Sequence, residues 1–225
     1  MSDAQIKAVF FDFDGVLTDF ECGAQNVCHN LHNKTGIPLE RLLACYNKYV
    51  MDLCLGKITH KDMWDNFCRQ VGAKVNIKLL DYAFRATPLN NGMFDLAGRL
   101  RKNYKIGIIT DNSKERFYAI VNEYGLRDAF DAVILSADVG DSKQGAGIFA
   151  RALESFDVKS DSCIFIDNSR KNLEVPKRMG FKTIFWDFER WNRSKASSEQ
   201  SERDDFGKKG IDSLLTSLKA LGIES

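Results

Sequence analysis

Five short apolar runs, separated by longer polar or amphipathic stretches, set the pattern of this chain. They cover residues 6–13, Lys105–Thr110, Ala132–Leu135, Cys163–Asp167 and Lys182–Trp186. Continuous apolar runs of this length are typical of strands buried on both faces of a sheet. Between the later runs, apolar residues recur at helical spacing, for example Phe117, Ile120, Val121 and Tyr124 before Gly125. This alternation predicts an α/β fold with a parallel sheet and helices on both faces.

The stretch from about residue 20 to residue 88 interrupts this alternation. It contains no strand-like run, and its apolar residues fall at helical spacing between turn formers such as Pro38, Gly56 and Gly72. A turn is then predicted over residues 88–92, where the chain returns to the α/β core. We therefore expect a discontinuous core formed by residues 1–19 and 89–225, with a helical insertion over 20–88.

Residues 187–210 have a different character from the rest of the chain. They are rich in Ser, Lys, Arg, Glu and Asp, with few apolar side chains apart from Phe188, Trp191 and Phe206. Such a composition favours a mobile surface loop. After it, a short amphipathic helix is predicted through Leu214, Leu215, Leu218 and Leu221.

Composition narrows the class of protein. The 225 residues are 44% apolar and carry a net charge of +1, so there is material for a core but no reason to expect nucleic acid or an anionic membrane as partner. No apolar run approaches the roughly 20 residues that span a bilayer. Because the first apolar run reads as a strand and not as a signal peptide, we expect a cytoplasmic protein whose six cysteines are free thiols. The oligomeric state is unknown at this stage.

Two aspartates follow the first predicted strand, Asp12 and Asp14, with Gly15 directly after them. Open α/β sheets bind ligands outside the carboxyl ends of their strands, and residues i and i+2 of a strand point to the same side. Two carboxylates at such a place repel each other unless a cation or a shared proton compensates. The pair therefore predicts a metal site, or an acid and a base with divided roles.

The segment Asp12–Asp19, DFDGVLTD, closely resembles the first motif of the haloacid dehalogenase superfamily, whose members are mostly phosphatases. The resemblance continues in chain order at Ile108–Thr110, Ser136–Lys143 and Phe165–Asn172, which look like the second, third and fourth motifs. It implies a Rossmann-like core, and it implies that the helical insertion over 20–88 is the cap that covers the active site in many members.

The resemblance also implies a mechanism, and each role has a physical reason. Asp12 would attack phosphorus to form an aspartyl-phosphate, and Asp14 would act as general acid and then as general base. Thr110, Asp111 and Lys143 would surround the phosphate. The hydroxyl of Thr110 would hydrogen-bond a phosphoryl oxygen, and Lys143 would offset negative charge. Asp111 stands where an asparagine is common.

The same resemblance implies a Mg²⁺ cofactor held by Asp12, by the backbone carbonyl of Asp14 and by the fourth motif. That motif often carries two adjacent acids, but here they are Asp167 and Asn168. Asn168 can ligate through its amide oxygen without bringing a charge, so either residue is a candidate ligand and the affinity for Mg²⁺ is expected to be lower. Gln144 replaces the proline that usually follows the lysine.

Four functions are compatible with these motifs. The first is a Mg²⁺-dependent phosphatase acting on a small phosphorylated metabolite, since capped members of the family usually act on metabolites. A sugar-phosphate mutase would use the same aspartyl-phosphate with a sugar hydroxyl as acceptor. A weakly active or non-catalytic binding module is suggested by Asn168 and Gln144. A 2-haloacid dehalogenase is the weakest alternative, because dehalogenating members lack the second acid, which this chain keeps as Asp14.

Overall fold

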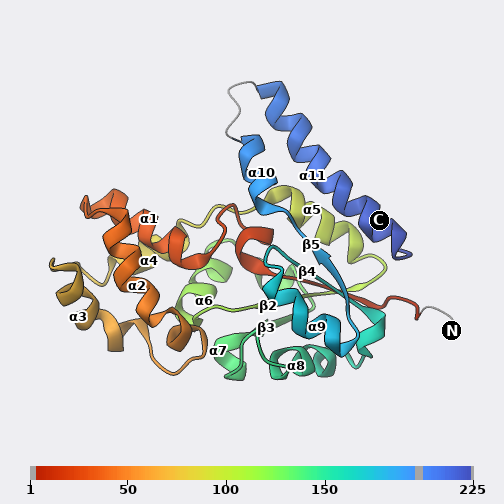
Figure 1. Ribbon diagram of the computed structural model, residues 1–225, viewed down its shortest axis with the longest axis horizontal. Helices are drawn as coiled ribbons and strands as arrows, with labels where there is room; N and C mark the ends of the chain where they lie inside the picture. The colour runs from red at the N-terminus through yellow and green to blue at the C-terminus, as the bar shows by residue number, and fades with distance from the viewer. Residues whose placement is uncertain (1–3, 196–199, 224–225) are drawn as a thin grey trace.

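The computed structural model describes residues 4–195 and 200–223, and its centre is a five-stranded parallel sheet (Figure 1). The strands are β1 (Ala8–Phe11), β2 (Lys105–Thr110), β3 (Ala132–Leu135), β4 (Cys163–Asp167) and β5 (Lys182–Phe185). Strands β2, β3 and β4 have the predicted bounds, whereas β1 and β5 are shorter than the apolar runs that predicted them. The strand order β3-β2-β1-β4-β5 is that of a Rossmann-like sheet, as expected.

The order of the strands positions the predicted chemistry. Strand β1 lies at the centre, and its last residue, Phe11, is in register with Ile108 of β2 and Ile166 of β4. Asp12 leaves the sheet directly after this pairing. Thr110 and Asp167 are the last residues of β2 and β4, so parallel pairing brings these polar side chains to one edge of the sheet.

Helices cover both faces of the sheet, as the alternation predicted. On one face, α5 (Asn91–Leu100), α6 (Lys114–Glu123) and α11 (Gln200–Ala220) pack with Val9 and Phe11. On the other, α8 (Gly147–Phe156) and α9 (Glu174–Met179) pack with Ala8 and Phe10. Successive residues of a buried strand face opposite sides, which explains why β1 is apolar throughout. The short helix α7 (Ser136–Val139) follows β3, and single 3₁₀ turns span Leu126–Asp128, Ser160–Ser162 and Lys171–Leu173.

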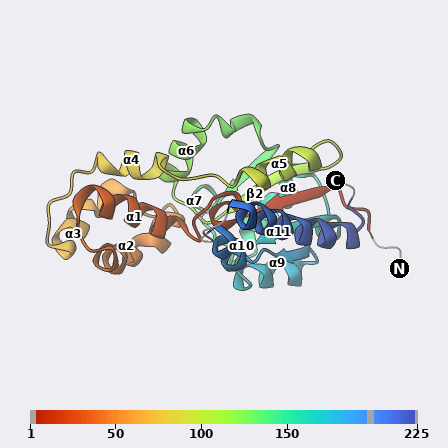
Figure 2. The same ribbon diagram turned by 90° about the horizontal axis from the view of Figure 1, so that it is seen from above.

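The early insertion is helical and lies at one end of the sheet (Figures 1 and 2). It contains α1 (Gly23–Thr35), α2 (Leu39–Cys54), α3 (His60–Val71) and α4 (Leu79–Arg85), which enclose a hydrophobic cluster of their own. The segments that connect the insertion to the core lie side by side, because Thr18 before it and Leu89 after it form an antiparallel bridge. This bridge supports a division into 1–19 with 89–225 and 20–88, which we keep as a proposal.

The loop predicted over residues 187–210 is wrong for the part that the structure describes. Strand β5 ends at Phe185, helix α10 spans Phe188–Lys195 and α11 begins at Gln200; residues 196–199 lie outside the described residues. Trp186 and Phe188 are buried in the core cluster, and the Trp186 and Trp191 ring centroids are 5.7 Å apart. A few aromatic side chains therefore attach this segment to the core, although its average composition is polar. The predicted closing helix is the end of α11, which is 21 residues long.

Two further expectations concern the whole chain. All six cysteines are free thiols, as expected. Among the described residues, no helix combines the length and the apolar character needed to cross a bilayer.

Candidate active site

Asp12 is held in place by main-chain contacts at the carboxyl end of β1. Its N–H donates to the carbonyl of Ile166 at 2.8 Å, and its own Oδ1 accepts the N–H of Phe13 at 2.7 Å. The chain then turns sharply through Gly15, which has a φ of 77°. A Cβ at this position would lie 2.9 Å from the backbone carbonyl oxygen of Glu21. Only glycine fits both the left-handed backbone and this close approach.

Lys143 lies between two buried carboxylates. Its Nζ is 2.8 Å from Oδ1 of Asp12 and 2.8 Å from Oδ2 of Asp167. Burial raises the pKa of Asp12 well above its ordinary value, and the negative charge of Asp167 adds to this, while Lys143 opposes both. Burial alone would lower the pKa of Lys143, but Asp12 and Asp167 outweigh it and raise it. The structure thus brings the predicted nucleophile and the predicted lysine into direct contact.

Thr110 and Asp111 follow one another at the end of β2 but differ in their contacts. The Thr110 side chain is buried, and its Oγ1 has no hydrogen-bond partner within the described residues. An unpaired buried hydroxyl is costly, so this atom is suited to a ligand oxygen. Asp111 accepts the backbone N–H of Lys143 at 3.0 Å. Its carboxylate therefore orients the Lys143 loop, and its predicted role in binding phosphate stays a prediction.

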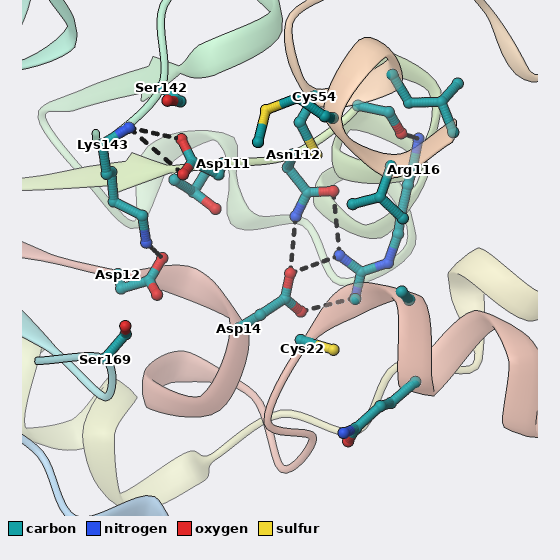
Figure 3. Close-up of a pocket in the computed structure, with 18 of the residues that line it drawn as sticks. Asp12, Asp14, Cys22, Cys54, Asp111, Asn112, Arg116, Ser142, Lys143 and Ser169 are labelled. Atoms are coloured by element: carbon teal, nitrogen blue, oxygen red, sulfur yellow. Dashed lines mark hydrogen bonds and ion pairs between the residues drawn. The ribbon is translucent and has the colours of Figure 1, made fainter. Parts of the chain in front are cut away.

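Asp14 makes a buried ion pair that the sequence did not reveal. Nη1 and Nη2 of Arg116 donate to the two Asp14 oxygens at 2.8 and 2.7 Å, and Nδ2 of Asn112 donates to Oδ2 at 2.9 Å (Figure 3). Nη1 of Arg116 also donates to Oδ1 of Asn112 at 3.1 Å. Asn112 directly precedes Ser113, the N-cap of α6, and Arg116 lies in the first turn of that helix. The sequence predicted the start of this helix but not the burial of the arginine.

The first turn of α1 closes over this ion pair. A Cβ added to Gly23 would lie 2.6 Å from Nη1 of Arg116 and 3.0 Å from Oδ2 of Asp14. Glycine at this position lets the backbone of the insertion pass directly over the core residues. The insertion is therefore in contact with the predicted acid and base of the site.

The fourth motif uses its acid to shape its own loop. Asp167 accepts the N–H of Ser169 at 2.7 Å and Nδ2 of Asn172 at 3.2 Å, in addition to Lys143. Asn168, beside it, donates from Nδ2 to the carbonyl of Glu21 at 3.3 Å. Asp167 is thus joined directly to the Asp12–Lys143 pair, whereas Asn168 reaches toward the segment that leads into the insertion.

These side chains line a cavity of about 540 Å³ between the sheet edge and helix α2. The core contributes Asp12, Asp14, Thr110, Asp111 and Lys143, and Asn168 also lines it. Helix α2 contributes the facing wall through Tyr46, Asn47, Val50, Met51, Leu53 and Cys54. A pocket with convergent polar groups on one wall and a largely apolar facing wall is a typical small-molecule site.

The comparison with protein families agrees with this geometry. The profile of the haloacid dehalogenase-like hydrolases matches residues 6–180, which is most of the chain. The chain belongs to the haloacid dehalogenase-like hydrolases. The fold and the family expected from the four motifs are therefore confirmed.

Several relatives of this haloacid dehalogenase-like hydrolase are named as phosphatases. A phosphatase of Mycobacterium tuberculosis is 25% identical over 192 residues, covering 81% of this chain and 88% of the relative. A glyceraldehyde 3-phosphate phosphatase of Pyrococcus furiosus is 26% identical over 200 residues, covering 82% of each. Among solved structures, a HAD family enzyme of Bacteroides thetaiotaomicron, crystallised as a magnesium complex, has a TM-score of 0.68 at 20% identity, covering 81% of this chain and 93% of that one.

Proposed function

We propose that this hydrolase is a magnesium-dependent phosphatase that cleaves a small phosphate monoester through an aspartyl-phosphate on Asp12. The observation that carries the proposal is the arrangement around that carboxylate. Nζ of Lys143 is 2.8 Å from it. Thr110, the last residue of β2, lines the same cavity, and its hydroxyl has no hydrogen-bond partner among the described residues. A nucleophile, a cation and a free hydroxyl at one end of a cavity are the groups that phosphoryl transfer requires.

The reaction has two steps. An Asp12 oxygen forms a bond to phosphorus while the bond to the leaving oxygen breaks, and a protonated Asp14 side chain supplies the proton that the leaving oxygen takes. Arg116 and Asn112 then pair with the Asp14 carboxylate, as they do in the structure. Water attacks the aspartyl-phosphate, the Asp14 carboxylate takes its proton, and the carboxylate of Asp12 is restored. Lys143 and Thr110 stabilise the phosphoryl oxygens throughout.

The charges and donor atoms of the site suit Mg²⁺. Four aspartates lie at this end of the sheet. Asp14 pairs with the Arg116 side chain, Asp12 and Asp167 share the Lys143 side chain, and Asp111 accepts the backbone N–H of Lys143. A divalent cation would balance the remaining two negative charges, and carboxylate, amide and carbonyl oxygens are ligands that Mg²⁺ accepts.

Within the described ranges, no group of three or more His, Cys, Asp or Glu side chains is arranged to hold a metal. The set we propose therefore includes other oxygens: the carboxylates of Asp12 and Asp167, the backbone carbonyl of Asp14 and the amide oxygen of Asn168. When bound there, Mg²⁺ would neutralise charge on the phosphoryl oxygens.

The substrate we propose is a small phosphorylated metabolite. The Pyrococcus relative is named for a three-carbon sugar phosphate, and a D-ribitol-5-phosphate phosphatase of Bacteroides thetaiotaomicron is 26% identical over 205 residues. A cavity of about 540 Å³ closed by α2 accommodates molecules of this size.

The test is release of inorganic phosphate by the purified protein from p-nitrophenyl phosphate and a panel of sugar and polyol phosphates. With Mg²⁺ we expect turnover, and with EDTA we expect a fall of at least about 100-fold that added Mg²⁺ reverses. An isomerised sugar phosphate without free phosphate would indicate a mutase. Halide release from a chloroacid without metal would indicate a dehalogenase, and no turnover with no Mg²⁺ binding would contradict an enzymatic role.

Asn168 gives a second, more specific prediction. The variant Asn168→Asp adds a carboxylate beside Asp167 at the proposed metal site. We expect the Mg²⁺ concentration that gives half-maximal activity to fall by about tenfold, since added ligand charge strengthens binding of hard cations. Mg²⁺ titrations of activity and calorimetry measure this. Equal Mg²⁺ dependence in both proteins would exclude Asn168 as a direct ligand.

A further inference from the structure

The hydroxyl group of Ser136 joins the insertion to the core. Ser136 is the first residue of α7, directly after β3, and its side chain is buried. Its Oγ accepts the backbone N–H of Asn112 at 3.0 Å and donates to the backbone carbonyl of Cys54 at 2.6 Å. The carbonyl of Asn112 is farther away, at 3.5 Å, so the hydroxyl hydrogen is directed at Cys54. Because a backbone N–H only donates and a carbonyl only accepts, both roles are unambiguous.

The bond to Cys54 attaches the wall of the cavity to the core. Cys54 is the last residue of α2, and both Leu53 and Cys54 line the cavity. The last carbonyl groups of a helix have no partner within the helix, so the Ser136 hydroxyl satisfies one of them. The end of α2 is thus bonded to the core where it closes the cavity.

The loop that follows α2 also packs directly against the core. Gly56 has a φ of 67°, and a Cβ there would overlap the backbone carbonyl oxygen of Ala137, in α7. At the start of α3, the backbone N–H of His60 donates at 3.0 Å to Oε1 of Glu115, in the first turn of α6. Contacts with both α6 and α7 therefore fix the position of the end of α2.

The bond to Asn112 leads in the other direction, to the predicted acid and base. Asn112 is buried, and its Nδ2 donates to Oδ2 of Asp14 at 2.9 Å (Figure 3). Since Ser136 holds the backbone of Asn112, it also sets the place from which this side chain reaches Asp14. Proton transfer depends on the alignment of the donor with the reacting oxygen, so a small displacement of Asp14 slows it.

We infer that Ser136 is a positioning residue that couples the position of helix α2 to the alignment of Asp14, acting through Asn112. With α2 packed over the substrate, the hydroxyl holds Asn112, and Asn112 holds the Asp14 side chain where it exchanges a proton with the leaving oxygen. This inference rests on the proposed phosphatase function and adds a link between the insertion and the proton transfer.

The experiment compares an ester whose leaving group needs a proton with one whose leaving group does not. The most active sugar or polyol phosphate of the panel releases an alcohol oxygen that must be protonated, whereas p-nitrophenyl phosphate releases a stable phenolate. The value of kcat/KM reports the steps up to cleavage of the ester bond, so hydrolysis of the aspartyl-phosphate does not affect it. In Ser136→Ala, we expect kcat/KM to fall at least about tenfold for the sugar or polyol phosphate and less than about threefold for p-nitrophenyl phosphate.

Two further variants separate positioning from folding. Ser162→Ala is the matched control, because Ser162 is also buried, donates from Oγ to the carbonyl of Lys159 at 2.7 Å and does not line the cavity. It should leave the ratio of the two kcat/KM values unchanged. Gly56→Ala displaces the end of α2 without removing the Ser136 hydroxyl, and it should lower the same ratio by a smaller factor. Hydrogen exchange in the last turn of α2 should be faster in Ser136→Ala and Gly56→Ala than in Ser162→Ala, and melting temperatures check the fold.

A double variant tests whether the effect passes through Asn112. Asn112→Ala removes the bond to Asp14. Adding Ser136→Ala to it should lower kcat/KM for the sugar or polyol phosphate by less than about a further twofold, whereas independent effects would multiply.

The outcomes distinguish this inference from the proposed function. No phosphate release from any ester by the wild-type protein contradicts the phosphatase itself. An equal fall of kcat/KM for both esters in Ser136→Ala, or effects that multiply in the double variant, overturns the role of Ser136 and leaves the phosphatase standing. If Ser136→Ala does not fold, Gly56→Ala provides the test, and an unchanged ratio in that variant overturns the inference.

Discussion

Asp12→Asn should lower kcat for every phosphate ester by at least about 10³-fold, because the amide cannot form the bond to phosphorus. The folded state should not lose stability. Burial and the charge of Asp167 already disfavour an anion at this position, and Lys143 retains Asp167 as a partner. The measurements are steady-state phosphate release and the free energy of unfolding in denaturant.

Two controls make this result specific to the nucleophile. Asp95→Asn makes the same chemical change at an exposed position of α5 and should leave activity intact. Rapid acid quenching with labelled substrate should trap phosphate on the wild-type protein and none on the variant. Activity of Asp12→Asn within tenfold of wild type would show that another group attacks phosphorus.

Some residues of the site were not identified from the sequence. Among these, we expect Arg116→Met to lower the free energy of unfolding most. The guanidinium is buried and makes two hydrogen bonds to the Asp14 carboxylate, so its removal leaves a buried anion with Asn112 as its remaining partner. Breaking one side of a buried ion pair typically costs about 3–5 kcal/mol. Denaturant unfolding monitored by circular dichroism measures the loss.

A double variant tests the cause of that loss. In Arg116→Met with Asp14→Asn the buried charge is gone, so most of the lost stability should return although activity does not. Arg99→Met, at an exposed position of α5, should change the free energy of unfolding by less than about 0.5 kcal/mol. A double variant as unstable as Arg116→Met alone would mean that packing, and not the uncompensated carboxylate, explains the effect.

The fold was predictable because buried strands leave a local signature. Each strand of the sheet is an apolar run, and in β1 both faces pack against helices, so no polar residue interrupts it. The polar residues that follow β1, β2 and β4 meet because parallel pairing aligns carboxyl ends. Hence the Asp12–Asp14 pair was identifiable before any coordinates, and the resemblance to the second, third and fourth motifs added Thr110, Lys143 and Asp167.

The loop expected over 187–210 shows where this reasoning fails. Its average composition is polar, and helix formation there depends on Phe188 and Trp191 reaching the core cluster. Composition averages over a segment, whereas anchoring depends on a few side chains and on what lies opposite them. The end of β5 and the surface next to it are set by the tertiary structure.

The sequence alone therefore determined the parallel sheet, the helical insertion, the family and the strand-end residues, because each leaves a periodic or contiguous pattern along the chain. Only the tertiary structure decided that Arg116 binds Asp14 and that Glu115 binds His60 beneath Tyr46. These pairs join residues 102 and 55 positions apart. These contacts form because the side chains are buried together where the insertion packs against α6. No local sequence pattern encodes this packing.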